Sequence, residues 1–375
     1  MKARVLVAGL AVVWLAACGG GGAAAPVASP SSVPPVASAP ASKPAASQAA
    51  AGSPAASAKP AASAKPAASG LTPLKGSYTT TSPTGGPMWI GRETGIFNRN
   101  GLDVGLTSVQ APAAMPALTT NDTQFSSSGA AEVATLDLQG GSVVMVAEGA
   151  AMPIFSLFAD KKYKTIQDLA GQTIGVTSIG AASDTVAHLF LRKFGMEDKV
   201  KIAAAGGSSG TILAAMTQGI IGGGILIPPV TTQAERAGFV ELVNGVKLGV
   251  PYTQGSIVLT RSFAKDKPDV RDRLLKSYLE AWQFVSNPAN KDQVLKIFEL
   301  YTKTNEADSE SAYSFMLPLW QSQKVPYMTD TAIKNVLSFL ADPKAKDADP
   351  KQFYDNTFLE AIAKAQGLPG PSASS

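Results

Sequence analysis

The amino-acid sequence predicts an α/β protein with two lobes, and three observations lead to this class. Residues 165–195 read as strand, loop and helix, the repeating unit of α/β sheets. Strand-like and helix-like segments alternate on both sides of this unit and are interrupted at residues 251–255, after which strand character resumes. About 300 of the 375 residues follow a low-complexity leader, which is enough for two lobes of ordinary size.

The unit at residues 165–195 shows both periodicities clearly. Residues 172–176 are a short β-branched run between a glycine and a polar loop, which is typical of a buried parallel strand. From Val186 to Phe194 apolar residues recur at helical spacing, so they form one face of a helix that ends at Gly195.

The loop between this strand and this helix, residues 178–185, is the first candidate site. Its small residues allow close approach to the backbone, and its hydroxyls can cap the helix or donate to a ligand. A helix N-terminus carries unpaired N–H groups, so a small anionic or polar group could bind there without Lys or Arg. The alternative is that Ser183 only caps the helix.

The first eighteen residues predict export. Residues 1–4 are basic, and residues 5–17 form an apolar run that is shorter than the roughly 20 residues of a membrane span. Residues 1–17 are therefore predicted to be a signal peptide. The ending Leu-Ala-Ala-Cys resembles a bacterial lipobox, which implies cleavage before Cys18 and its lipidation. The alternative is an ordinary signal peptide with an incidental cysteine. As the only cysteine, Cys18 leaves no intramolecular disulfide.

Residues 18–70 are predicted to be a disordered tether that follows the lipidated cysteine. They consist mainly of Ala, Pro, Ser and Gly, which cannot form a core. A coil of this length spans about 40 Å, and a polyproline-like chain up to roughly 160 Å. Residues 369–375 are expected to form a disordered tail.

Charge and histidine content exclude several classes of protein. The net charge is +4, without a basic stripe interleaved with aromatics, so no nucleic-acid partner is expected. His188 is the only histidine, which excludes a His/Cys metal cluster and any catalytic triad that uses another histidine. Gly222–Gly224 lack the rest of a dinucleotide-binding pattern. We therefore expect no metal, no cofactor and no catalytic residue.

The remaining elements follow from the same periodicities. Pro87 suits the first turn of a helix at residues 88–94, which Gly95 ends. Further strands are expected at residues 75–81, 123–127, 141–148, 225–227 and 256–260. Further helices are expected at residues 115–120, 268–286, 293–301, 309–320, 331–340 and 352–366. Their aromatic residues are expected in the core: Trp282, Tyr301, Tyr313, Phe315 and Trp320.

Residues 87–104 carry a resemblance to a known family. The runs Glu-Thr-Gly-Ile-Phe at 93–97 and Gly-Leu-Asp-Val at 101–104 resemble the substrate-binding proteins of ABC importers for nitrate, aliphatic sulfonates, taurine and thiamine-pyrimidine precursors. Ile-Gln-Asp-Leu-Ala-Gly at 166–171 resembles the start of that family's second lobe, and the resemblance spans roughly residues 74–368. Residues 218–224 depart from the family, which often has an acidic residue there.

The resemblance implies a type II periplasmic-binding-protein-like fold with a hinge and a ligand cleft between the lobes. Lobe 1 would comprise residues 71–159 and 255–368, and lobe 2 residues 160–253. The lipobox-like ending independently implies a lipid anchor, so we expect a monomeric protein held on the extracytoplasmic side of the membrane. Such a protein captures a small polar, anionic or heteroaromatic solute and delivers it to an ABC permease and its ATPase.

Two alternatives to import stay open. A ligand-sensing receptor subunit would read the same in sequence. An enzyme that makes the thiamine pyrimidine shares the fold, but its chemistry uses histidine and iron, and this chain has a single histidine.

The ligand is expected between the lobes, where loops open helices and strands end. The expected contacts are Pro87, Met88, Trp89, Ser127 and Ser128 from lobe 1, and Gly180, Ala181, Ala182, Ser183, Asp184, Thr185, Pro228 and Tyr252 from lobe 2. Trp89 and Tyr252 could instead be structural. Asp184 would repel a bare anion, so a zwitterion, an amide or a heteroaromatic ring stays open as the ligand.

Overall fold

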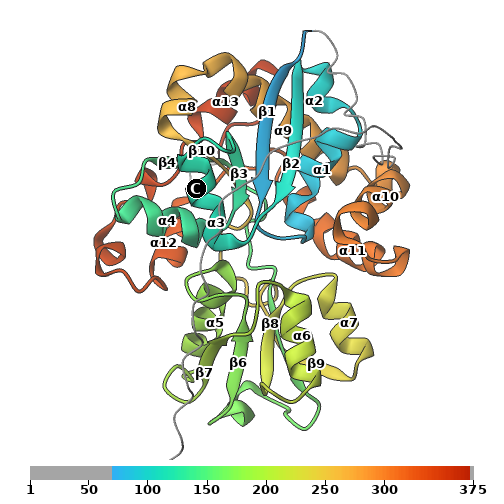
Figure 1. Ribbon diagram of the computed structural model, residues 1–375, viewed down its shortest axis with the longest axis vertical. Helices are drawn as coiled ribbons and strands as arrows, with labels where there is room; N and C mark the ends of the chain where they lie inside the picture. The colour runs from blue at the N-terminus through green and yellow to red at the C-terminus, as the bar shows by residue number, and fades with distance from the viewer. Residues whose placement is uncertain (1–69, 372–375) are drawn as a thin grey trace, which may run out of the picture. The chain divides into compact units, whose positions relative to one another are not determined.

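The computed structural model describes residues 70–371. The predicted signal peptide, Cys18, the tether up to residue 69 and the last four residues of the tail lie outside the described residues. The described chain forms two five-stranded sheets, each covered by helices (Figure 1). The α/β class and the two-lobe arrangement are therefore confirmed.

The first sheet has the strand order β2-β1-β3-β10-β4. Its strands are β1 (Thr72–Tyr78), β2 (Leu102–Ser108), β3 (Phe125–Ser128), β4 (Val143–Ala147) and β10 (Ser256–Thr260). β1 pairs in parallel with β2 and β3, whereas β10 runs antiparallel between β3 and β4. The strand that returns late in the sequence is thus built into the interior of the first sheet.

The helices of the first lobe come from both parts of the chain. The early ones are α1 (Gly86–Glu93), α2 (Ile96–Arg99), α3 (Ala111–Thr119) and α4 (Ala130–Leu138). The late ones are α8 (Arg261–Asp266), α9 (Pro268–Ser286), α10 (Lys291–Thr302), α11 (Glu306–Ser322), α12 (Asp330–Leu337) and α13 (Thr357–Ala365). Short 3-10 turns lie at Pro83–Gly85, Pro288–Asn290, Pro343–Asp347 and Pro350–Gln352. The helix predicted at residues 268–286 has the same bounds in the structure.

The second sheet has the order β7-β6-β8-β5-β9. Its strands are β5 (Ser156–Asp160), β6 (Thr173–Val176), β7 (Lys201–Ala204), β8 (Gly223–Leu226) and β9 (Phe239–Asn244), with a 3-10 turn at Ile166–Leu169. The helices are α5 (Ala182–Lys193), α6 (Ser209–Thr217) and α7 (Val230–Arg236). β6 pairs in parallel with β7 and β8, as the β-branched run predicts.

The strand β5 requires a correction to the expected lobe boundary. Residues 156–160 pair antiparallel with β8 and β9, so they belong to the second sheet. A boundary after Ala159 would cut this strand. Four of its five residues are buried, and such a pattern would suit a strand of either sheet. Only the observed strand pairing shows which sheet β5 joins.

The chain crosses between the sheets twice, and the two crossings pair with each other. The N–H of Ala150 donates to the carbonyl of Gln254 at 2.8 Å, and the N–H of Gln254 donates to the carbonyl of Ala150 at 3.0 Å. The N–H of Tyr252 donates to the carbonyl of Ala151 at 3.0 Å. A Cβ at Gly149 would lie 2.5 Å from the carbonyl oxygen of Gly255, so the close approach requires glycine there. These contacts form the hinge.

The core of the first lobe is rich in aromatic rings. Trp89 is fully buried and stacks on Tyr301 with ring centroids 4.9 Å apart, while Phe298 meets it edge-on. Trp282, Tyr313 and Trp320 are buried, and Tyr301 and Phe315 pack against the same core. The aromatic residues predicted for the core are confirmed.

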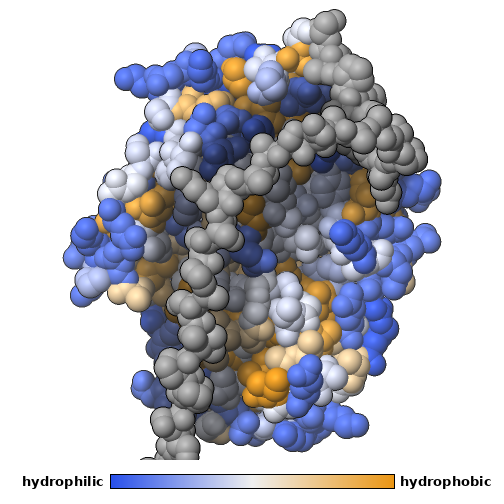
Figure 2. All heavy atoms as spheres, viewed as in Figure 1, coloured by the Kyte–Doolittle hydropathy of each residue, from blue (hydrophilic) through white to orange (hydrophobic). Residues whose placement is uncertain are grey.

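The face of the molecule shown in Figure 2 carries hydrophilic residues along much of its rim, with apolar patches between the hydrophilic areas. The exposed large apolar side chains among residues 70–371 are Ile179, Phe194, Ile220 and Leu300. Within the same residues, no helix combines the length and the apolar character that crossing a membrane requires.

Candidate functional site

A cavity of about 680 Å³ lies between the two lobes. This volume falls within the range of small-molecule sites. The first lobe contributes Thr79, Thr80, Thr81, Gln110, Glu132 and Lys303, among others. The second lobe contributes residues 177–178, 181–183, 207–210 and 227–230, together with Gln233.

The N-termini of four helices meet at this cavity. Gln110 and Gly129 precede α3 and α4 in the first lobe, and Ala181 and Ser208 precede α5 and α6 in the second. The first turn of a helix leaves N–H groups without partners inside the helix, and these groups favour polar or anionic ligand atoms. The strand-to-helix connections of both sheets therefore supply the cavity with backbone donors.

The lobes touch on one side of the cavity through α7 and α11. Arg236 forms an ion pair with Asp308 at 2.6 Å, and the amide of Gln233 donates to the same carboxylate at 3.1 Å. The hydroxyls of Thr232 and Ser311 lie 2.7 Å apart. The Arg236 guanidinium lowers the pKa of Asp308, so this carboxylate is charged at neutral pH.

A second contact between the lobes involves α5 and the chain that follows α12. The Nη1 atom of Arg192 donates to the carbonyl of Ser338 at 2.8 Å. The same guanidinium lies over the ring of Phe339, 4.7 Å from its centroid. With the α7 contacts, these polar interactions hold the two lobes around the cavity.

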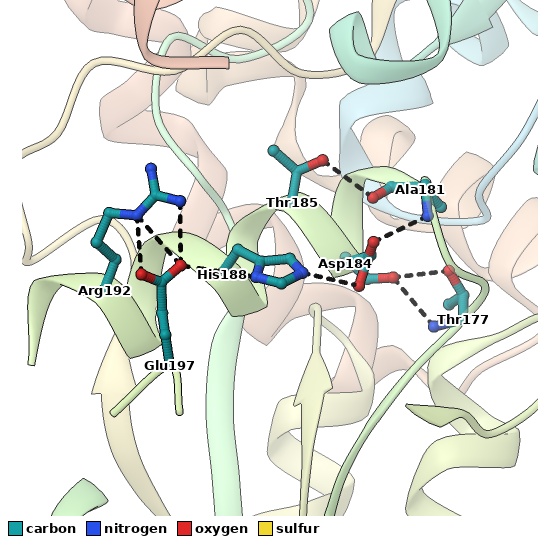
Figure 3. A network of polar contacts seen from close by, with 9 residues as sticks. Thr177, Ala181, Asp184, Thr185, His188, Arg192 and Glu197 are labelled. Atoms are coloured by element: carbon teal, nitrogen blue, oxygen red, sulfur yellow. Dashed lines mark hydrogen bonds and ion pairs between the residues drawn. The ribbon is translucent and has the colours of Figure 1, made fainter. Parts of the chain in front are cut away.

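The loop before α5 is organised by its own side chains (Figure 3). The Ser183 hydroxyl accepts from the N–H of Thr177 at 3.0 Å and lies 2.8 Å from the Thr177 hydroxyl. The Asp184 carboxylate accepts from the N–H of Gly180 at 2.9 Å, and the Thr185 hydroxyl donates to the carbonyl of Ala181 at 3.3 Å. Ser183 thus fixes the end of β6 to the first turn of α5.

The position of Ser183 contradicts the alternative that it only caps the helix. The residue before α5 is Ala181, which makes no side-chain cap hydrogen bond, and Ser183 lies inside the first turn. Its hydroxyl bonds back to the strand because the loop brings Thr177 within reach.

Replacing Ser183 with alanine is expected to destabilise the protein by about 1–2 kcal/mol, since the N–H of Thr177 loses its acceptor. Urea unfolding of the variant and the wild type measures this difference. Ser262→Ala, at an exposed position on α8, is the matched control. Equal stability of the Ser183→Ala and wild-type proteins would contradict the expectation.

His188 continues the polar chain along α5 (Figure 3). Its Nε2 lies 3.8 Å from Asp184 and its Nδ1 lies 3.8 Å from Glu197, which in turn pairs with Arg192 at 3.1 Å. The imidazole is partly exposed and does not line the cavity. No group of side chains that could hold a metal ion occurs among residues 70–371.

Glu132 is the one carboxylate in the cavity lining. It lies in the first turn of α4, and its Oε1 accepts from the N–H of Ala182 across the cleft at 3.4 Å. Its Oε2 is enclosed and has no hydrogen-bond partner. Burial raises the pKa of this carboxyl, although hydrogen bonds from the backbone lower it in part.

Four of the thirteen predicted contacts line the cavity: Ala181, Ala182, Ser183 and Pro228. The four remaining residues predicted for lobe 2 do not line the cavity: Gly180, Asp184, Thr185 and Tyr252. Gly180, Asp184 and Thr185 instead shape the loop behind the lining. Tyr252 is fully buried at the hinge, where burial raises the pKa of its hydroxyl and the charges of Glu132 and Asp184 raise it further.

The five predicted contacts of lobe 1 do not line the cavity: Pro87, Met88, Trp89, Ser127 and Ser128. Trp89 belongs to the aromatic core. The hydroxyl of Ser127 donates to the carbonyl of Gly255 at 3.1 Å, and that of Ser128 lies 2.8 Å from the hydroxyl of Ser126. These groups are buried and used within the lobe, so the first lobe presents other residues.

Several lining residues were missed in the sequence. Residues 206–210 read Gly-Gly-Ser-Ser-Gly before a helix, the same signal that singles out residues 178–185, and could have been found. The threonines at 79–81 follow β1 and could have been assigned to a strand end. Glu132 and Gln110 carry no such signal, because only the folded arrangement turns them to the cleft.

The two α/β lobes, the paired crossings and the cavity between them define a periplasmic-binding-protein-like fold of type II. The family described as "NMT1/THI5 like" matches residues 82–291, which is more than half of the chain. The chain therefore belongs to the NMT1/THI5 like family. No curated protein sequence matches it.

Solved structures share this fold over most of the chain. A structure from Bordetella bronchiseptica RB50 has a TM-score of 0.68 at 20% identity and covers 79% of this chain and 98% of its own. A putative periplasmic sulfonate-binding protein, SsuA, from Methylobacillus flagellatus KT has a TM-score of 0.64 at 16% identity, covering 82% and 99%. The periplasmic nitrate-binding protein NrtA from Synechocystis PCC 6803 has a TM-score of 0.66 at 14% identity, covering 81% and 92%.

Proposed function

We propose that the protein is a solute-binding component of an ABC importer that captures a small molecule between its lobes and delivers it to a permease and its ATPase. The observation that carries this proposal is the cavity of about 680 Å³ whose lining comes from both lobes. Hydroxyls, amides and helix N-termini bind a solute without reacting with it, which suits a carrier that releases its cargo.

The similar structures support transport over catalysis. SsuA is described as a periplasmic sulfonate-binding protein and NrtA as a periplasmic nitrate-binding protein. The predicted signal peptide and tether agree with a role outside the cytoplasm. We infer that the chain is not an enzyme and acts as a monomer on the extracytoplasmic side of the membrane.

For the site, we propose a ligand contacted by Ala181, Ala182, Ser183 and Pro228 from the second lobe. Gln110, Glu132 and the threonines at 79–81 would contact it from the first lobe. We place the lobe boundaries within the paired crossings, at residues 148–155 and 245–255, so that β5 and β9 stay in the second lobe.

Thermal-shift screening of the exported chain against small solutes tests this function. A ligand that binds only the folded state stabilises it by RT ln(1 + [L]/Kd), or about 2.7 kcal/mol at a hundredfold excess over Kd. Selective stabilisation by one solute class, followed by uptake that depends on the protein in cells, is the expected result. Stabilisation by no solute, or turnover of the bound solute, would contradict the proposal.

We propose in addition that Cys18 carries a lipid anchor. Its replacement with serine is expected to move the protein from the membrane fraction to the soluble exported fraction. Cell fractionation and mass spectrometry of the amino terminus measure the change. Ser31→Ala, within the predicted tether, is the control, and an unmodified Cys18 in the wild-type protein would contradict the proposal.

A further inference from the structure

The surroundings of Glu132 indicate the chemistry of the solute. Its Oε2 is enclosed without a partner, and its Oε1 has one long hydrogen bond, the 3.4 Å contact with Ala182. A Cβ at Gly129 would collide with Oε2, so the glycine leaves the space that this carboxylate occupies. The carboxylate therefore has unused acceptor capacity beside the cavity.

No cation of the described chain neutralises Glu132. Among residues 70–371, no Lys, Arg or His forms an ion pair with it. Lys303 is the cation in the cavity lining, and it takes part in none of the ion pairs of the described residues. Asp184 accepts from the N–H of Gly180 through Oδ2, and its Oδ1 has no hydrogen-bond partner and lies 3.8 Å from His188 Nε2. Of these two carboxylates, Glu132 is the one that lines the cavity.

An enclosed carboxylate without an ion-pair partner raises the free energy of the folded protein unless a bound ligand supplies that partner. A bare sulfonate or nitrate would meet it with like charge. A protonated nitrogen would supply both the missing charge and the missing donors, and charge-assisted hydrogen bonds of this kind are the strong ones.

We propose that Glu132 is a specificity-determining residue that binds a protonated nitrogen group of the solute, such as an ammonium, amidinium or aminopyridinium. The inference rests on the proposed solute-binding function and deepens it. Lys303 lines the same cavity and is free to bind an acceptor on the same solute.

The test is a thermal-shift panel of small solutes in matched sets, in which a cation, a neutral amide and a sulfonate share one carbon frame. Benzamidine, benzamide and benzenesulfonate form one such set. The cationic members are expected to give the largest stabilisation of the wild-type protein. Calorimetry on the best cation is expected to show about 10- to 100-fold weaker binding to Glu132→Gln.

The number of protons released on binding is a second measurement, and a residue with only a structural role would not change it. Because burial raises the pKa of Glu132, binding of a cation lowers it and releases a proton near that pKa. Calorimetry in buffers of different ionisation enthalpy is expected to detect this release in the wild-type protein and not in Glu132→Gln. Glu235→Gln, at an exposed position on α7, is the control and is expected to behave as wild type.

The outcomes separate the inference from the proposed function. Preferential stabilisation by sulfonates, with equal affinity in Glu132→Gln, would overturn the inference and leave solute binding intact. Stabilisation by no member of the panel or of a wider solute library would overturn both. If Glu132→Gln unfolds, the wild-type ranking of cation, amide and sulfonate still decides.

Discussion

Replacing Ala182 with tryptophan is expected to weaken solute binding by about 100-fold or more, which corresponds to about 2.7 kcal/mol. Ala182 begins α5 in the second lobe, and its Cβ lies 3.1 Å from where a Cβ on Gly129 of the first lobe would stand. An indole has no room in this gap while the lobes are closed. The variant therefore keeps its two folded lobes but cannot close around a solute.

Calorimetry with the best solute from the thermal-shift panel measures the loss, and small-angle scattering detects the open form. Ala214→Trp is the matched control, because Ala214 lies on an exposed face of α6 outside the cavity lining. Wild-type affinity in a folded Ala182→Trp protein would remove the first turn of α5 from the site.

Replacing Glu148 with glutamine is expected to stabilise the protein by up to about 3 kcal/mol at pH 7. Glu148 follows β4, is fully buried, and neither carboxyl oxygen has a hydrogen-bond partner. Burial raises its pKa to about 8, although the side chains of Thr253 and Gln323 lower it in part. In the variant, the amide could donate to the free acceptors of Thr253 and Gln323.

The direction of the pH effect follows from this raised pKa. Below the ordinary glutamate pKa of about 4.3, both the folded and the unfolded state hold the proton, and Glu148 destabilises neither. Between that value and about 8, the unfolded state ionises while the folded state stays protonated, so stability falls as pH rises. Above about 8 the difference stays constant.

Urea unfolding at pH 5, 7 and 8.5 measures this dependence. The difference in unfolding free energy between Glu148→Gln and the wild type is expected to grow across the series. Glu235→Gln, whose side chain is exposed, is expected to leave the pH dependence unchanged. Parallel pH profiles for the wild type and Glu148→Gln would contradict the prediction.

The sequence predicted the elements with a strong period and missed distinctions that depend on tertiary pairing. Residues 268–286 repeat apolar residues at helical spacing over five turns, and α9 has those bounds. The strand at 256–260 was also predicted with its observed bounds, but nothing local shows that it runs antiparallel between β3 and β4. The same limit explains β5, whose pairing partners lie more than sixty residues away.

The residues of the site also differ in whether the local sequence can identify them. Small and hydroxyl-bearing residues before a helix identify residues 181–183 because loop composition is a local property. Trp89 and Tyr252 were ambiguous because an aromatic ring serves a cleft or a core equally well, and here both are fully buried. Glu132 lies in the first turn of α4, and only the folded structure, with α5 opposite, shows that its Oε2 lacks a partner.

The paired crossings determine what kind of motion the two lobes can make. A single connecting strand would let the second lobe swivel, whereas two strands joined by main-chain hydrogen bonds resist twisting and permit bending about one axis. Bending about that one axis would bring α5 and α6 back to the same orientation against Gln110 and Glu132. The hydrogen bonds that set this axis join backbone atoms. Side chains in the cleft can therefore change to suit new solutes without changing the direction in which the hinge bends.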